Sequence, residues 1–254
     1  MSLAYDIHGE GPPLLLVHGM ALDRRMWEPN MAALTEGRRV VRCELRGFGA
    51  SAPPDGPYSH AEDLRALLGE LGIERAAVVG LSLGGGIALE LALAHPQAVA
   101  ALVLVDTDLP GVPMRDTALL EAIGAVRALA RAGELDAARA AWLALPMFAH
   151  SAPDVVATLA AIVGDYSLWH WLNPNPHVAL DPPAGARGGE ISAPTLVLRG
   201  EHDVADAVDN SERIARDIPG AISVVLAAAG HMSNMDAPAA FDAALVEFLA
   251  AVGS

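Results

Sequence analysis

Short apolar segments alternate along the chain with Ala/Leu-rich stretches of helical character, and this alternation restricts the fold more than any other feature. Most of the segments are apolar at consecutive positions, which is typical of strands buried on both faces. The seven candidate strands are Leu3–Ile7, Leu14–His18, Val40–Leu45, Ala76–Gly80, Leu102–Asp106, Thr195–Arg199 and Ser223–Ala227. The candidate helices between and after them are Pro29–Thr35, His60–Leu71, Leu83–His95, Asn210–Ile218 and Pro238–Ala251. The pattern predicts an α/β fold, in which helices cover both faces of a mostly parallel sheet.

The alternation breaks between residues 107 and 192, where no strand pattern occurs. A Pro/Gly-rich stretch over residues 173–189 closes this segment. We therefore predict one α/β core formed by residues 1–106 and 193–254, with residues 107–192 as a helical insertion. The helices expected in the insertion lie near Asp116–Ala132, Glu134–Leu145 and Asp154–Ile162.

Charge and residue usage exclude several classes of function. The net charge is −15 and the 16 basic residues, all arginine, are scattered along the chain, so no nucleic-acid partner is expected. A chain without lysine cannot form the Schiff base that pyridoxal enzymes and lysine aldolases need. The single cysteine, Cys43, excludes a disulfide framework and a cysteine-rich zinc site, and no His-Glu-x-x-His pattern occurs. Neither a metal nor an organic cofactor is expected.

The sequence also bears on the compartment. No apolar run reaches the roughly 18 residues that a membrane span needs, so no membrane association is expected. The segment Met1–Pro13 is polar and lacks the basic and apolar regions of a signal peptide. We expect a cytoplasmic protein. Homo-oligomerisation stays open, because an exposed apolar interface cannot be located from sequence alone.

Ser82 has the sequence context of a catalytic nucleophile. It stands in Gly80-Leu81-Ser82-Leu83-Gly84, between a candidate strand and a candidate helix. A strand that turns sharply into a helix exposes the residue at the turn on the carboxyl edge of the sheet, and flanking glycines leave room for the turn. The helix N-terminus adds unpaired N–H groups that favour a developing anion. The pattern therefore favours a nucleophilic serine over an incidental one.

A nucleophilic serine needs a base and an orienting acid. His231 is the candidate base, because it follows the last strand and so lies at the same carboxyl edge as Ser82. Asp203 is the preferred acid, since it follows the strand Thr195–Arg199. Competing acids after neighbouring strands are Asp106, Asp108 and Asp206. The remaining histidines lack this context, and His18 is interpreted as structural.

An oxyanion formed at Ser82 would need two hydrogen-bond donors. The N–H of Leu83, directly after the nucleophile, is one candidate. The loop after the strand Leu14–His18 ends at the same edge of the sheet, so the N–H of Met20 is the other. Both donors are backbone groups, so their side chains affect only the shape of the site.

Together these motifs resemble the α/β-hydrolase fold superfamily over essentially the whole chain. The matching stretches are His18-Gly19, Gly80-x-Ser82-x-Gly84-Gly85, Gly200-Glu201-His202-Asp203 and Gly230-His231-Met232. The resemblance implies an α/β-hydrolase fold with seven or eight strands, seven if the chain begins at the family's second strand, and a helical cap formed by the insertion. Glu44 stands where the family more often has aspartate. Within the superfamily the chain looks most like the small serine carboxylesterases and the 3-oxoadipate enol-lactonase-like hydrolases.

The resemblance implies hydrolysis of a carboxylic ester or lactone through an acyl-enzyme. The large apolar side chains expected in the pocket favour a small to medium, mainly apolar substrate with little charge. Candidate pocket residues are the large apolar side chains Trp27, Trp142, Met147, Phe148, Trp169 and Trp171. The tryptophans of the insertion could instead form its own small core. An anionic lactone would need a basic pocket residue, for which Arg127, Arg131 and Arg187 are candidates, but a solvated helix face is the preferred interpretation of each, and the net charge of −15 disfavours an anionic substrate.

Two other classes of function stay open at this point. The same serine, histidine and aspartate could perform carbon–carbon bond hydrolysis, perhydrolysis or thioester cleavage, which share these motifs. Some proteins of this fold bind ligands without turnover. The complete set of Ser82, Asp203 and His231 argues against a pure binding protein.

Overall fold

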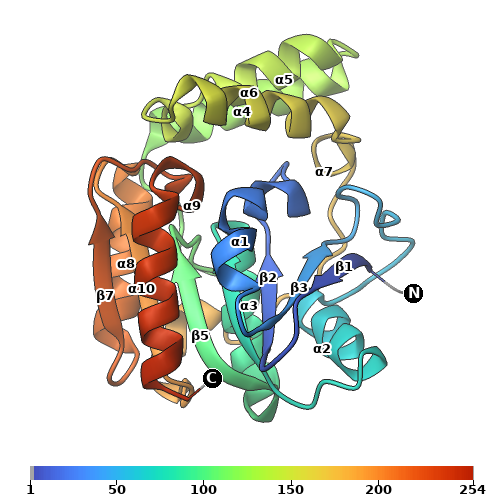
Figure 1. Cartoon of the computed structure of the whole chain (residues 1–254). Helices are drawn as coiled ribbons and strands as arrows, with labels where there is room; N and C mark the ends of the chain where they lie inside the picture. Colours follow the sequence, from blue (N-terminus) through green and yellow to red (C-terminus); the bar gives the residue numbers. More distant parts are fainter. Residues whose placement is uncertain (1–2, 254) are drawn as a thin grey trace.

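The computed structural model describes residues 3–253 (Figure 1). Residues 1, 2 and 254, the outer ends of the predicted core ranges, lie outside the described residues. Seven strands form one sheet in the order β1-β3-β2-β4-β5-β6-β7. They are β1 (Ala4–His8), β2 (Pro13–Val17), β3 (Arg39–Glu44), β4 (Ala76–Leu81), β5 (Val99–Val105), β6 (Thr195–Gly200) and β7 (Ile222–Leu226). The strand β1 is antiparallel to β3, and all other neighbours are parallel. The predicted strands and the mostly parallel sheet are confirmed.

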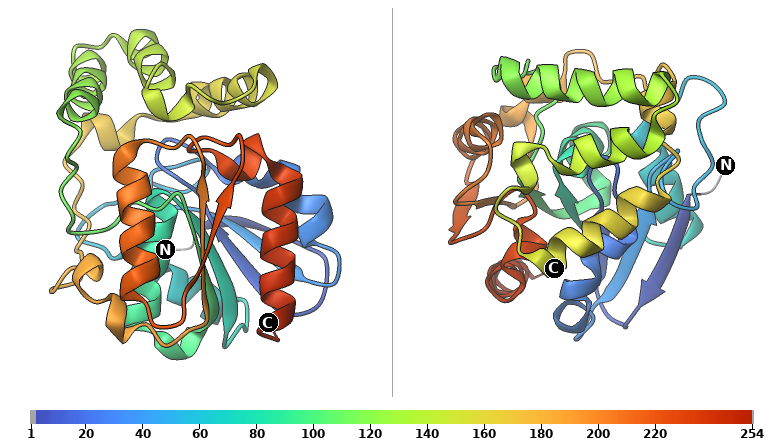
Figure 2. Two further views of the ribbon diagram at one scale, coloured as in Figure 1. Left: turned by 90° about the vertical axis from the view of Figure 1, so that its left-hand side faces the viewer. Right: turned by 90° about the horizontal axis from the view of Figure 1, so that it is seen from above.

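Helices cover both faces of this sheet. In Figures 1 and 2, α1 and α10 lie on one face and α2, α3 and α8 on the other. Their bounds are α1 (Met31–Leu34), α2 (His60–Glu70), α3 (Leu83–Ala94), α8 (Ala205–Asp217) and α10 (Pro238–Ala251), with the four-residue α9 (Ser233–Asp236) before the last of them. The central strands are apolar on both sides because both faces are covered, and Leu14 to Val17 of β2 are fully buried.

Two predicted helices differ from the structure. The segment Pro29–Thr35 contains the end of a 3₁₀ helix, Arg24–Asn30, followed by the single turn α1. The helix predicted at Asn210–Ile218 begins five residues earlier, at Ala205. Only three of its residues, Ala207, Ser211 and Ile214, are buried, and the polar run over residues 209–212 interrupts the apolar pattern, so the first turn was not recognised as part of the helix.

Four α-helices occupy the segment 107–192 between β5 and β6. They are α4 (Thr117–Arg131), α5 (Leu135–Leu143), α6 (Pro153–Asp165) and α7 (Trp169–Leu172). Figure 1 shows α4, α5 and α6 as a separate layer beyond the carboxyl ends of the strands, toward which the arrows of β2 and β5 point. Seen from above, this layer extends across the sheet edge (Figure 2). The short α7 has no counterpart in the predicted helices, because four residues are too few to show a period.

No helix within residues 3–253 combines the length and the apolar character that crossing a membrane requires.

Candidate active site

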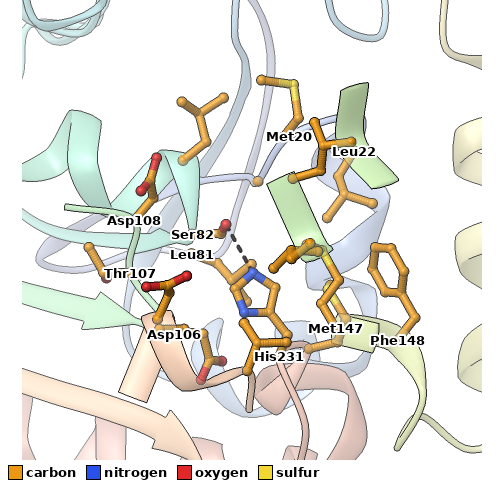
Figure 3. Close-up of a pocket in the computed structure, with 18 of the residues that line it drawn as sticks. Met20, Leu22, Leu81, Ser82, Asp106, Thr107, Asp108, Met147, Phe148 and His231 are labelled. Carbon is orange, nitrogen blue, oxygen red and sulfur yellow. Dashed lines mark hydrogen bonds between the residues drawn. The ribbon is translucent and has the colours of Figure 1, made fainter. Parts of the chain in front are cut away.

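Ser82 alone makes the turn between β4 and α3. The strand ends at Leu81 and the helix begins at Leu83, and Ser82 has φ 53° and ψ −116°, a conformation that residues with a side chain rarely adopt. Its N–H donates to the carbonyl oxygen of Val105 at 2.8 Å, and its carbonyl oxygen accepts from the N–H of Gly85 at 2.9 Å. These bonds hold the turn and project the hydroxyl into a cavity at the carboxyl edge of the sheet (Figure 3).

The glycines around Ser82 are required by close backbone contacts. A Cβ atom at Gly80 would lie 2.1 Å from the carbonyl oxygen of Gly84. A Cβ atom at Gly84 would lie 2.3 Å from the carbonyl oxygen of Val17 in β2. Both distances are far inside van der Waals contact with backbone that cannot rotate away. The packing of α3 against β2 and β4 therefore depends on these glycines.

Replacing Gly84 by alanine should lower the free energy of unfolding by about 3 kcal/mol, because the new methyl group forces α3 away from β2. Gly124 in α4 is the matched control, since a Cβ atom there meets nothing within 4 Å. Alanine at Gly124 should stabilise the protein by up to about 1 kcal/mol. Urea unfolding followed by circular dichroism measures both changes. Equal stabilities of the two variants would contradict the packing described above.

His231 and Asp203 reach Ser82 from two neighbouring loops. Asp203 follows β6 and His231 follows β7. The Nε2 atom of His231 lies 3.0 Å from the Oγ atom of Ser82, the bond drawn in Figure 3. On its other side, Nδ1 lies 2.9 and 3.1 Å from the two carboxylate oxygens of Asp203. A carboxylate only accepts, so Nδ1 carries the proton and Nε2 of the neutral ring is left to accept from the serine hydroxyl.

The charges around His231 favour its protonated form. Burial of the imidazole acts to lower the pKa of His231, but the nearby carboxylates of Asp203, Asp106 and Asp108 outweigh burial and raise it to about 9. The side chain of Asp203 is fully buried and that of His231 nearly so. An imidazolium formed on proton transfer from Ser82 would therefore be stabilised in place.

Of the four candidate acids, only Asp203 bonds to His231 among the described residues. The carboxylate of Asp106 accepts from the N–H of Gly200 at 2.8 Å and from the N–H and hydroxyl of Ser233. These bonds join the loop before Asp203 to the turn after His231, so Asp106 helps to position both. Burial, together with the charge of Asp203, raises the pKa of Asp106 well above its usual range.

The other two candidate acids line the cavity without touching the imidazole. Asp206 accepts from the backbone N–H groups of Arg115 and Asp116 and so anchors the start of the segment 107–192. Asp108 follows Asp106 and lies at the cavity wall (Figure 3).

Met20 and Leu83, whose N–H groups are the predicted oxyanion donors, lie at the cavity that Ser82 faces. Leu83 is the first residue of α3, so its N–H has no acceptor inside the helix. The Met20 loop is held by His18, whose Nε2 accepts from the N–H of Leu45 at 3.0 Å and whose Nδ1 therefore donates to Gly19 at 2.8 Å. Burial lowers the pKa of His18 to about 4, so its ring stays neutral, in keeping with the structural interpretation.

The cavity at Ser82 has a volume of about 220 Å³ and a mainly apolar wall. Four of the predicted pocket residues line it: Trp142, Met147, Phe148 and Trp171. The predictions for Trp27 and Trp169 need correction. Trp27 is fully buried in the core, where its ring lies 6.2 Å from that of Phe241. Trp169 precedes Trp171 by two residues in a helix, about 200° around the axis, so the two rings point to opposite sides and only Trp171 faces the cavity.

One face of α4 completes the wall and was not predicted as a unit. Leu119, Ile123 and Arg127 recur at intervals of four residues and all line the cavity. This interval is visible in the sequence as a helical face, but the sequence does not indicate what the face covers. Residues 106–108 at the end of β5 also line the cavity, which their position at the carboxyl edge could have indicated.

Within residues 3–253, no three histidine, cysteine, aspartate or glutamate side chains lie close enough together to hold a metal ion. Cys43 is buried in β3 with its thiol near the carbonyl oxygen of Leu16.

A parallel sheet with a strained serine between strand and helix, and with a histidine and an acid on the following loops, defines an α/β hydrolase. The chain belongs to this family: the profile of the alpha/beta hydrolase fold matches residues 12–238. It is 32% identical to a protein of Variovorax paradoxus with the provisional name carbamate hydrolase RutD, over 100% of this chain and 98% of that one. It is also 32% identical to the 2-hydroxymuconate semialdehyde hydrolase of Pseudomonas putida, over 95% and 88% of the two chains.

A solved structure of similar fold is the enol-lactonase from Burkholderia xenovorans. The TM-score is 0.81 at 29% identity, and the match covers 98% of this chain and 96% of that one.

Proposed function

We propose that the protein is a serine hydrolase that cleaves a carboxylic ester or a lactone through an acyl-enzyme. The observation that carries this proposal is the continuous hydrogen-bonded chain from Ser82 through His231 to Asp203. It ends at a hydroxyl that faces a largely apolar cavity, which Met20 and Leu83, the residues of the proposed oxyanion donors, also line. Such a chain activates the hydroxyl toward a carbonyl carbon.

In the proposed reaction, the Oγ atom of Ser82 attacks the carbonyl carbon while Nε2 of His231 takes the hydroxyl proton. The negative charge that develops on the carbonyl oxygen is held by the N–H groups of Met20 and Leu83. His231 then gives its proton to the leaving alcohol, and the acyl group remains on Ser82. Water, deprotonated by His231, attacks the acyl-enzyme and releases the acid. Asp203 keeps the imidazole in the required tautomer throughout.

The cavity supports a small to medium substrate with an apolar body. Its wall is formed by Trp142, Phe148, Trp171 and other apolar side chains, and its volume is about 220 Å³. We propose that the segment 107–192 acts as the cap of this site, because α4 and the region around Met147 supply much of that wall. A wall of this kind selects substrates by shape more than by hydrogen bonding.

Carbon–carbon bond hydrolysis is the second candidate. Its support is the likeness to the 2-hydroxymuconate semialdehyde hydrolase, whose named substrate is a semialdehyde and not an ester or a lactone. The likeness to the enol-lactonase supports lactone cleavage, and the relative named for carbamate hydrolysis extends the list of carbonyl substrates. Thioester cleavage and perhydrolysis use the same nucleophile and complete the set of alternatives.

A substrate panel distinguishes these reactions. We expect the purified protein to hydrolyse p-nitrophenyl esters, with a maximum of kcat/KM between acetate and octanoate, or to open simple lactones. The panel also contains an aryl carbamate, an acyl thioester and a vinylogous 1,5-diketone for carbon–carbon cleavage. Turnover of the diketone alone would replace the ester proposal by the second candidate. A protein that turns over none of these compounds would instead fit a ligand-binding role.

A further inference from the structure

We propose that Arg127 binds a carboxylate at the far end of the substrate, so that the site takes esters or lactones that combine an apolar body with an anionic end. This inference rests on the proposed function for the reacting carbonyl and adds the chemical class of the remaining part. The sequence alone does not show whether an arginine of the segment 107–192 serves as a basic residue of the substrate pocket.

Arg127 shares the cavity with the reacting groups. It lines the same cavity as Ser82 and His231 and is the third member of the face of α4 that carries Leu119 and Ile123. A substrate bound with its carbonyl at Ser82 and its apolar body against this face therefore shares one cavity with Arg127. Among the described residues that line the cavity, Arg127 is the only one with a permanent positive charge.

The guanidinium of Arg127 has no ion-pair or hydrogen-bond partner among the described residues. Three other arginines in the segment are paired, Arg115 with Asp209 at 3.2 Å, Arg139 with Asp136 at 3.2 Å and Arg187 with Glu190 at 2.7 Å. No acidic residue stands three or four positions from Arg127 in α4. Its donors are therefore available to a ligand, and a guanidinium binds a carboxylate with two parallel bonds.

The acidic side chains of the cavity fix the orientation of such a substrate. The carboxylates of Asp106 and Asp206 are occupied by backbone N–H groups, and neither bonds to Arg127. Asp106 lies beside the reacting groups and Asp206 lies at the start of α8, and both repel an anion at these places. In a protein of net charge −15, an anionic substrate needs a local cation, and Arg127, an exposed residue that lines the same cavity, supplies it.

The test compares mono-p-nitrophenyl esters of dicarboxylic acids, from succinate to suberate, with the same esters capped by a methyl group. We expect the wild-type protein to prefer the acidic ester at one chain length by about tenfold or more in kcat/KM, and this preference should fall with added salt. Arg127→Gln should lose about 10- to 100-fold on that ester, mainly through KM, and less than about twofold on the capped ester. Arg127→Lys should recover part of the loss.

Arg131→Gln is the matched control, since Arg131 lies one turn further along α4 and does not line the cavity. Arg131→Gln should leave kcat/KM unchanged on both the acidic and the capped ester. An equal preference of the wild-type protein for acidic and capped esters at every chain length would overturn the inference, as would equal losses in the two glutamine variants.

A binding measurement separates this inference from the proposed function. Binding of hexanoate, adipate, pimelate and suberate is measured by the quenching of tryptophan fluorescence during titration. Trp142 and Trp171 in the cavity wall contribute to this signal. Tighter binding of a dicarboxylate than of hexanoate, lost in Arg127→Gln and kept in Arg131→Gln, would support the anionic subsite even if no ester were hydrolysed. Equal binding by both variants would reject it, whatever the outcome of the ester assays.

Discussion

Ser82→Ala is expected to lower kcat by about a millionfold on any ester or lactone that the protein hydrolyses, because no acyl-enzyme can form without the hydroxyl. Activity should fall to the level that binding and the N–H groups of Met20 and Leu83 alone provide. The fold should be retained, since Ser82 anchors the turn through its backbone N–H and carbonyl groups. Alanine accepts the same backbone conformation with similar strain. Steady-state assays, with circular dichroism as a check of folding, measure the loss.

Ser192→Ala is the control for this variant, since Ser192 is an exposed serine just before β6, away from the cavity. It should keep wild-type kinetics. If Ser82→Ala retained more than about 1% of the wild-type kcat, a nucleophilic role of Ser82 would be untenable.

Asp203→Asn should lower kcat by about 10⁴-fold with little change in stability. An amide in place of the carboxylate can donate its N–H to Nδ1 of His231, which favours the tautomer whose Nε2 carries the proton. That tautomer cannot accept the proton of Ser82. The variant therefore tests the role of Asp203 separately from the presence of the serine.

The pH dependence gives the same variant a second readout. Only neutral His231 can act as the base, so the rate of the wild-type protein should rise with pH through the pKa of His231, which the neighbouring carboxylates raise to about 9. Removing the charge of Asp203 lowers this pKa, because burial then acts on the imidazole with less opposition. The rising limb of the kcat/KM profile should move to lower pH in Asp203→Asn, although its plateau is far lower.

Asp108→Asn is the matched control for the acid, because Asp108 is another carboxylate that raises the pKa of His231 but does not bond to it. It should lower kcat less than tenfold and shift the rising limb only slightly. A large loss in Asp108→Asn together with near-normal activity of Asp203→Asn would reassign the acid.

The sheet and the arrangement around Ser82 could be predicted because the signals are local. Strands buried on both faces are apolar at every position, so they stand out in a single sequence. The carboxyl ends of parallel strands meet at one edge, so Ser82, Asp203 and His231 could be placed together from their positions after three strands. The glycines on either side of Ser82 marked the turn itself.

Features that depend on tertiary packing could not be predicted in the same way. Trp27 and Trp169 are large and apolar like the residues that line the cavity, and only the direction of each side chain places them elsewhere. Only three residues of α8 are buried and a polar run over residues 209–212 separates its first turn from the rest, so periodicity did not mark its start. The role of Arg127 stayed open because the sequence does not show which face of α4 meets the cavity.

Labelling with a fluorophosphonate, followed by intact-mass and peptide mass spectrometry, tests the nucleophilic role of Ser82 most directly. The reagent phosphonylates an activated serine and needs no knowledge of the natural substrate. One adduct per chain on the peptide that contains Ser82, absent in Ser82→Ala and strongly slowed in Asp203→Asn, is the expected result. An unlabelled wild-type protein, or an adduct on another residue that persists in Ser82→Ala, would contradict the assignment of Ser82 as the nucleophile.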